Sequence, residues 1–144
     1  IGKLLAKNQC IVFCGGKSGI MESVSKGAKS VGGITVGVVK GNERNVSNSF
    51  VDIEIVTNSL TGSDAPPLIM SCDGLLILGG GAGTLEEMTI AYRNKIPMVA
   101  LTNFDGYGKK FAGKYLDDRK TVRIEKANSP RKAVELLLNI INKK

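Results

Sequence analysis

Short apolar runs alternate along the chain with segments whose apolar residues recur every three or four positions. Four of the runs are typical of buried parallel strands and cover residues 9–14, 34–39, 74–78 and 97–101. Residues 52–56 alternate apolar and polar side chains and predict an edge strand, and residues 121–125 predict a last strand. This alternation of strands and helices predicts an α/β fold, of the three-layer αβα, Rossmann-like kind with a mostly parallel central sheet.

Helical periodicity separates the strands. One helix is predicted from Gly19 to the Gly32-Gly33 pair, with Ile20, Val24, Ala28 and Val31 on its inward face. The other predicted helices cover 64–72, run from Thr84 with Leu85, Met88 and Tyr92 on one face, and follow Ser129-Pro130 with Val134, Leu137, Leu138 and Ile141 inward. Residues 1–8 resemble the last turns of an amphipathic helix. We therefore expect a single domain over residues 1–144 that is incomplete at its N-terminus.

The composition removes several classes of site. The 144 residues contain no His, which excludes a Ser-His-Asp relay and a His-ligated zinc or haem site. Three Cys without metal-ligand spacing argue against a disulfide framework, so we predict no metal site and a cytoplasmic location. No apolar run approaches the roughly 18 residues of a membrane helix, and no membrane association is expected.

The charge balance favours acidic partners. Twenty Lys and Arg against thirteen Asp and Glu give a formal net charge of +7, which attracts nucleotides, nucleic acids and other anions alike. A basic stretch covers residues 109–123, with only Phe111 and Tyr115 to stack on bases. Such a stretch is usually a solvated face, and single-stranded nucleic acid stays a third-ranked partner.

Two glycine-rich turns each join a predicted strand to a predicted helix. Glycines allow positive φ and close backbone approach, and the unpaired N–H groups of a helix start favour phosphate. The candidate phosphate- or nucleotide-binding residues are Gly15, Gly16 and Gly19 in the first turn and Gly80, Gly81, Gly83 and Thr84 in the second. Any tight turn between strand and helix also favours glycine, so each turn alone is weak support for a site.

Glu87 has two interpretations. The spacing Thr84-Leu85-Glu86-Glu87 fits a capping box, in which Thr84 and Glu87 bond to each other's backbone N–H groups and Glu87 only closes the helix. Alternatively, Glu87 lies at the anion site as a catalytic acid or base or as a ribose ligand. The spacing alone favours the capping box.

The sequence GGGAGTLEE at residues 79–87 resembles the PGGxGTxxE signature of the lysine-decarboxylase-like family, better known as the LOG (LONELY GUY) family. GGKSGIM at residues 15–21 resembles the GGxxGLM turn of that family, and the similarity extends over nearly the whole chain. The resemblance implies a Rossmann-like fold with a nucleoside 5′-monophosphate held by the second turn. Several members hydrolyse the bond between base and ribose phosphate, and Glu87 matches their catalytic glutamate.

Two departures from that signature matter. Gly79 replaces the motif proline, and the Arg-Lys pair that the hydrolases carry before the central strand is absent from residues 64–70. The loop GNERN at residues 41–45 is more similar to the branch that contains molybdenum-cofactor carrier proteins. The resemblance therefore implies, first, a binding protein for a phosphorylated small molecule, a nucleotide or a molybdopterin-like cofactor. A phosphoribohydrolase that uses Glu87 is the alternative.

Three further residues are candidates for ligand contact. Lys17 lies inside the first glycine turn, Arg44 lies in the polar loop, and Asn103 follows a predicted strand at the same sheet edge as the turns. A solvated cation or an ordinary turn residue is the alternative for each. The family resemblance also implies a homo-oligomer, a dimer or a tetramer.

Overall fold

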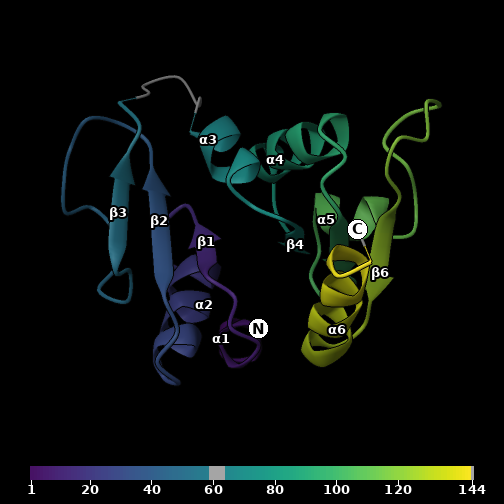
Figure 1. Ribbon diagram of the computed structural model, residues 1–144. Coiled ribbons are helices and arrows are strands. Elements are labelled where there is room, and N and C mark those ends of the chain that lie inside the picture. Colours follow the sequence, from purple (N-terminus) through teal and green to yellow (C-terminus); the bar gives the residue numbers. More distant parts are fainter. Residues whose placement is uncertain (59–63, 144) are drawn as a thin grey trace. The chain divides into compact units, whose positions relative to one another are not determined.

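The computed structural model describes residues 1–58 and 64–143, which contain six strands and six helices that alternate except where the second strand is followed directly by the third. All strand pairings are parallel, which confirms the predicted α/β, Rossmann-like fold. The chain divides into two compact units, Ile1–Leu68 and Ile69–Lys144, and α3 (Ala65–Met70) spans the division (Figure 1). The single domain stays a prediction.

The first unit contains a three-stranded sheet in the order β1-β2-β3. Its elements are α1 (Gly2–Lys7), β1 (Val12–Cys14), α2 (Ile20–Lys29), β2 (Thr35–Val39) and β3 (Ile53–Val56). Every residue of the central strand β2 is buried, whereas burial alternates along β3, as expected of an edge strand. The predicted edge position of residues 52–56 is thus confirmed.

Two expectations for this unit were wrong in detail. The first strand covers only Val12–Cys14, because residues 2–7 form α1 and the N–H of Cys10 bonds back to that helix. The helix α2 ends at Lys29, so Val31 lies beyond it, and Val31 and Ile20 are 36% and 45% exposed instead of buried. Ala28 faces inward as predicted.

The second unit contains a three-stranded sheet in the order β4-β5-β6. Its elements are β4 (Leu75–Leu78), α4 (Ala82–Arg93), β5 (Met98–Leu101), α5 (Tyr107–Phe111), β6 (Ile124–Ala127) and α6 (Pro130–Ile141). The helix α6 contacts all three strands, while α4 and α5 pack against each other and against β5 (Figure 1). The core includes Ile77, Met88, Met98, Leu101 and Ile124, each at most 1% exposed.

The start of α6 confirms the sequence pattern. Ser129 is the N-cap, its side chain accepts a hydrogen bond from the N–H of Lys132 at 3.4 Å, and Pro130 is the first helical residue. The last strand begins three residues and ends two residues later than predicted, at Ile124–Ala127, where it pairs with β5. Among the helices of the described residues, none has the length and apolar character needed to cross a membrane.

Candidate functional site

The first glycine turn, in the first unit, joins β1 to α2. Gly16 and Gly19 adopt positive φ values of 70° and 75°, and Gly19 is the N-cap of α2. Gly16 is buried, and both of its backbone polar groups are engaged. Its N–H bonds to the Cys14 sulfur at 3.4 Å, and its carbonyl oxygen accepts the backbone N–H of Asn48 at 2.7 Å.

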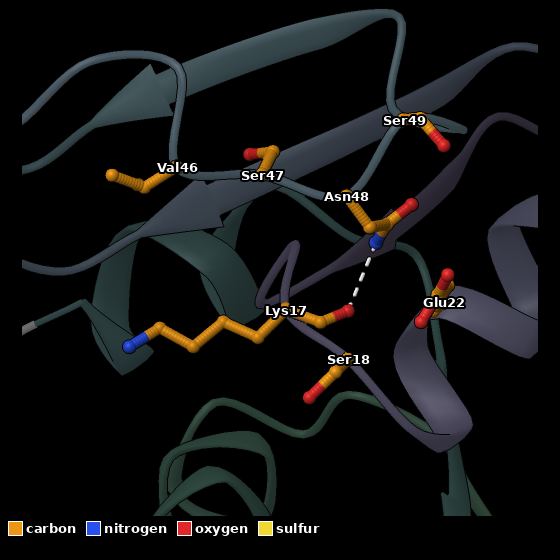
Figure 2. Close-up of a pocket in the computed structure, with 7 residues that line it drawn as sticks. All are labelled: Lys17, Ser18, Glu22, Val46, Ser47, Asn48 and Ser49. Atoms are coloured by element: carbon orange, nitrogen blue, oxygen red, sulfur yellow. Dashed lines mark hydrogen bonds between the residues drawn. The ribbon is translucent and has the colours of Figure 1, made fainter.

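The Asn48 side chain fixes this turn further. Its Nδ2 donates to the carbonyl oxygen of Gly16 at 3.0 Å and to that of Lys17 at 2.9 Å, and Figure 2 shows the second of these bonds. The turn and the loop that carries Asn48 border an open hollow of about 490 Å³. Its lining residues are Lys17, Ser18, Glu22, Val46, Ser47, Asn48 and Ser49. Lys17 is exposed at the edge of this hollow, and Arg44 is exposed elsewhere in the loop that follows β2.

The same loop is held by a carboxylate that the sequence did not identify. Glu54 on β3 accepts the backbone N–H groups of Asn45 at 2.6 Å, Val46 at 3.0 Å and Ser47 at 2.7 Å. The Ser47 side chain and these N–H groups lower the pKa of Glu54 below its ordinary value. A concave group of backbone N–H donors is therefore already occupied by the chain's own anion.

The electrostatics at the start of α2 are mixed. Glu22 lies in the first turn of the helix, where a carboxylate interacts favourably with the positive end of the helix dipole. Glu22 also lines the hollow, opposite in charge to Lys17. An incoming phosphate would meet a like charge at this helix start, so the first turn is the less suitable of the two for an anion.

The second glycine turn, in the second unit, joins β4 to α4. Gly79 and Gly80 have φ values of 74° and 95°, and the helix begins at Ala82 with Gly81 as its N-cap and no side-chain capping bond. The capping box predicted between Thr84 and Glu87 is therefore wrong. The helix starts two residues earlier than the pattern indicated, so Thr84 lies inside its first turn.

The helix start of α4 is open. The first intrahelical bond runs from the N–H of Leu85 to the oxygen of Gly81, which leaves the N–H groups of residues 81–84 without a helical partner. Gly81 and Gly83 are exposed, and a Cβ at either would meet no atom within 4 Å. The first turn of α4 carries no acidic residue. Gly83 has no positive φ, so its backbone conformation does not require glycine.

Two polar side chains lie along α4 near this start. Thr84 packs its side chain against Gly80, where any Cβ would collide with it. Glu87 follows three residues later on the same side of the helix; it is half-buried and has an interaction partner. The structure thus brings the predicted residues Gly80, Gly81, Gly83 and Thr84 together, with Glu87 one helical turn further on.

The other side of this turn is occupied by residues 106–108. The N–H of Tyr107 donates to the Gly80 oxygen at 2.9 Å, and that of Gly108 donates to the Gly79 oxygen at 3.1 Å. Neither this contact nor the short helix α5 is predicted by the sequence pattern. Asn103 is exposed in the turn after β5, beside a segment whose Asp105 pairs with Lys109 at 2.8 Å.

Charged and nucleophilic groups elsewhere give weaker indications. Within residues 1–58 and 64–143 no group of three or more Cys, Asp or Glu side chains has the proximity needed for a metal. Burial and the nearby Asp73 raise the pKa of the Cys72 thiol to about 11, which disfavours a reactive thiolate at neutral pH. In the basic stretch, Asp117 pairs with Arg119 at 2.5 Å and thereby offsets part of its charge.

The amino-acid sequence matches a known family and one protein of related sequence. The sequence model of the SLOG cluster4 family (LDcluster4) matches residues 1–134. An uncharacterized protein of Archaeoglobus fulgidus is 36% identical over 93 residues, which is 65% of this chain. The matched part spans only 60% of the length of that relative.

Solved structures are similar over a larger share of the chain. The X-ray structure of TM1055 has a TM-score of 0.89 and 31% identity and covers 96% of this chain and 83% of its own. The structure of a molybdenum cofactor binding protein from the phototrophic bacterium Rippkaea orientalis has a TM-score of 0.84 and 29% identity, and the match covers 97% of this chain and 83% of that protein. The molybdenum cofactor carrier protein of Chlamydomonas reinhardtii has a TM-score of 0.80 and 31% identity, and the match covers 99% of this chain and 84% of that protein.

Proposed function

The chain belongs to the SLOG cluster4 family, and we propose that it binds a phosphorylated small molecule at the start of α4. The observation that carries the proposal is the open helix start, where the N–H groups of residues 81–84 lack a helical partner and no side chain among the described residues caps them. Such groups bind phosphate through hydrogen bonds and the helix dipole.

The residues present suit a phosphate group. The backbone N–H groups of Gly81 and Gly83 and the hydroxyl of Thr84 would hold the phosphate, and the absence of side chains at the two glycines permits close approach. The role is non-covalent binding, in which the chain supplies donors and excludes competing carboxylates from the first turn of α4.

The names of two similar structures support a cofactor as the ligand. Both are molybdenum cofactor binding or carrier proteins, at 29% and 31% identity. We therefore place a phosphorylated pterin cofactor ahead of a nucleotide. A carrier of this kind uses the site for storage or transfer and needs no catalytic residue.

A phosphoribohydrolase is the second candidate because of Glu87. With the capping box absent, this carboxylate is not needed to close the helix, and it lies one turn from Thr84 on the same side. A carboxylate there suits cleavage of an N-glycosidic bond, which develops positive charge on the ribose and needs an activated water. The missing Arg-Lys pair at residues 64–70 ranks this candidate below binding.

Calorimetry and product analysis separate the two functions. Small molecules that co-purify with the chain are identified by mass spectrometry, and AMP is added as a test ligand. Binding without release of ribose 5-phosphate is expected for the carrier. Release that disappears in Glu87→Ala would instead establish the hydrolase. Binding of single-stranded DNA with a steep loss on added salt, and none of AMP, would favour a nucleic-acid partner.

Gly83→Val tests the location of the site. In a helix the Cα–Cβ bond points toward the N-terminus, so the valine side chain would cover the open N–H groups. We expect AMP affinity to fall at least about tenfold with the fold retained, because the position is exposed and helical. Unchanged binding in the variant would place the ligand elsewhere.

A further inference from the structure

We propose that residues 106–108 are positioning residues that set the anion affinity of the second glycine turn, although they lie about 25 positions away in sequence. Two backbone hydrogen bonds carry the inference, from the N–H of Tyr107 to the Gly80 oxygen at 2.9 Å and from the N–H of Gly108 to the Gly79 oxygen at 3.1 Å. The proposal rests on the proposed function for the ligand, but not for the shape of the turn.

The geometry of the peptide unit gives these bonds their consequence. In a planar trans peptide the C=O and the following N–H point in opposite directions. The Gly79 oxygen is bonded to residue 108 and the Gly80 oxygen to residue 107. The N–H groups of Gly80 and Gly81, which belong to the same two peptide units, therefore point away from this segment. With both glycines at positive φ, the bare turn has other accessible conformations, and the two bonds select one of them.

Close packing reinforces the selection. A Cβ at Gly106 would lie 2.5 Å from the Gly80 oxygen and 2.8 Å from its nitrogen, and one at Gly108 would lie 2.7 Å from Cγ2 of Ile77. Gly106 also has a φ of 127°, which L side chains rarely adopt. Only glycine at these two positions allows the segment to sit directly on the turn.

Tyr107 allows one of the hydrogen bonds to be removed cleanly. It is the first residue of α5, the position where proline is best tolerated in a helix, and the preceding Gly106 is not helical. Tyr107→Pro deletes both the aromatic ring and the N–H that donates to the Gly80 oxygen. Tyr107→Ala deletes the ring alone, so the difference between the two variants isolates the hydrogen bond.

The experiment uses the 144-residue chain labelled with ¹⁵N, with inorganic phosphate as the probe. Before phosphate is added, the amide signals of Gly80 and Gly81 should move further from their wild-type positions in Tyr107→Pro than in Tyr107→Ala. Phosphate affinity should then be about fivefold to tenfold lower in the proline variant than in the alanine variant, the usual effect of one hydrogen bond.

A second pair of variants controls for backbone strain. Gly106→Ala combines a positive φ with the collision at Gly80, whereas Gly113→Ala has a φ of 78° and meets no atom closer than 3.5 Å. We expect only Gly106→Ala to weaken phosphate binding.

The outcomes distinguish this inference from the proposed function. Equal Gly80 and Gly81 signals and equal phosphate affinities in the proline and alanine variants would overturn the positioning role while leaving the proposed function intact. If the wild-type chain does not bind phosphate, the proposed function fails. The amide signals of Gly80 and Gly81 then test by themselves whether residues 106–108 set the shape of the turn. A larger displacement in Tyr107→Pro than in Tyr107→Ala supports this role, and equal displacements overturn it.

Discussion

The two glycine turns join a strand to a helix in the same way, but different groups meet their helix starts. At α2 the chain supplies its own carboxylate, Glu22, and fixes the turn with the side chain of Asn48. At α4 no acidic residue lies in the first turn, and the turn is fixed from its other side by backbone groups of residues 107 and 108. The same motif therefore yields one helix start with an internal anion and one without.

The start of α6 is an example of a helix N-terminus that is capped by a side chain. α6 has the same length as α4, twelve residues, but Ser129 caps it and accepts the Lys132 N–H. A capping side chain occupies donors that a phosphate would otherwise bind. Neither α2 nor α4 has such a side chain at its N-cap, so what distinguishes α4 from α2 is that its first turn carries no acidic residue.

The largest expected effect comes from giving α4 its own anion. Gly81 has a φ of −96°, which any residue adopts, so Gly81→Asp can cap the helix with a carboxylate. Repulsion in place of attraction should lower the affinity for AMP about a hundredfold or more, by analogy with like charges at about 4 Å near a surface. Stability should rise by a few tenths of a kcal/mol. Calorimetry and urea unfolding measure the two effects.

Gly81→Asn is the matched control for that variant. Asparagine also caps a helix but carries no charge, so it should lower AMP affinity much less than aspartate does. Equal losses in the two variants would mean that helix-start electrostatics do not govern binding. A loss of both stability and binding in Gly81→Asp would mean that the turn does not tolerate a side chain.

The next effect concerns stability of the first turn. Asn48→Ala removes two bonds to the carbonyl oxygens of Gly16 and Lys17 and one from the N–H of Phe50. We expect the free energy of unfolding to fall by about 1–3 kcal/mol, given roughly 1 kcal/mol for each bond. Urea unfolding measures this change. AMP affinity should stay at the wild-type value, and a parallel loss of binding would contradict the assignment of the ligand to the second turn.

A smaller effect is expected from removing the internal anion of α2. Glu22→Gln deletes the favourable interaction with the helix dipole and should cost about 0.3–1 kcal/mol of stability. The same change should allow weak phosphate binding at the amides of residues 19–22, which NMR titration would detect. Glu43→Gln, in the exposed loop, serves as the control for loss of one negative charge.

The smallest effect is a local response to acid. The lowered pKa of Glu54 means that its stabilisation of the loop is complete above the ordinary carboxyl value and is lost as pH falls through the lowered value, below about pH 4. The amides of residues 45–47 should therefore lose hydrogen-exchange protection there, after correction for intrinsic rates. Those of Tyr107 and Gly108, which bond to carbonyl oxygens, should not. Protection that persists at residues 45–47 would contradict the role of Glu54.

Local patterns predicted some helix starts and misplaced others. Ser129-Pro130 acts as its sequence suggests, because the Ser129 side chain caps the helix and Pro130 is its first residue. Thr84 and Glu87 have the spacing of a capping box, but Gly80 is bonded to the distant Tyr107, Thr84 packs on Gly80, and the helix begins at Ala82. Long-range backbone contacts such as the bond between Tyr107 and Gly80 lie outside any local sequence window.

The contacts that fix the two turns also could not be predicted from the sequence. The helix α5 has five residues and too few apolar positions for a periodic signal, and it packs against α4 and β5, with Gly108 close to Ile77 of β4. Likewise, Glu54 lies in an ordinary alternating strand, and only the fold brings the N–H groups of residues 45–47 to its carboxylate. The positive φ values of Gly16, Gly19, Gly79 and Gly80, in contrast, could be predicted from the glycines themselves.

The most direct test of the open helix start is an NMR titration of the ¹⁵N-labelled wild-type chain with inorganic phosphate, read at both turns at once. The amide signals of residues 81–84 should shift and saturate together, while those of residues 19–22, beside Glu22, stay in place. Saturating shifts at residues 19–22 with none at residues 81–84 would contradict the account.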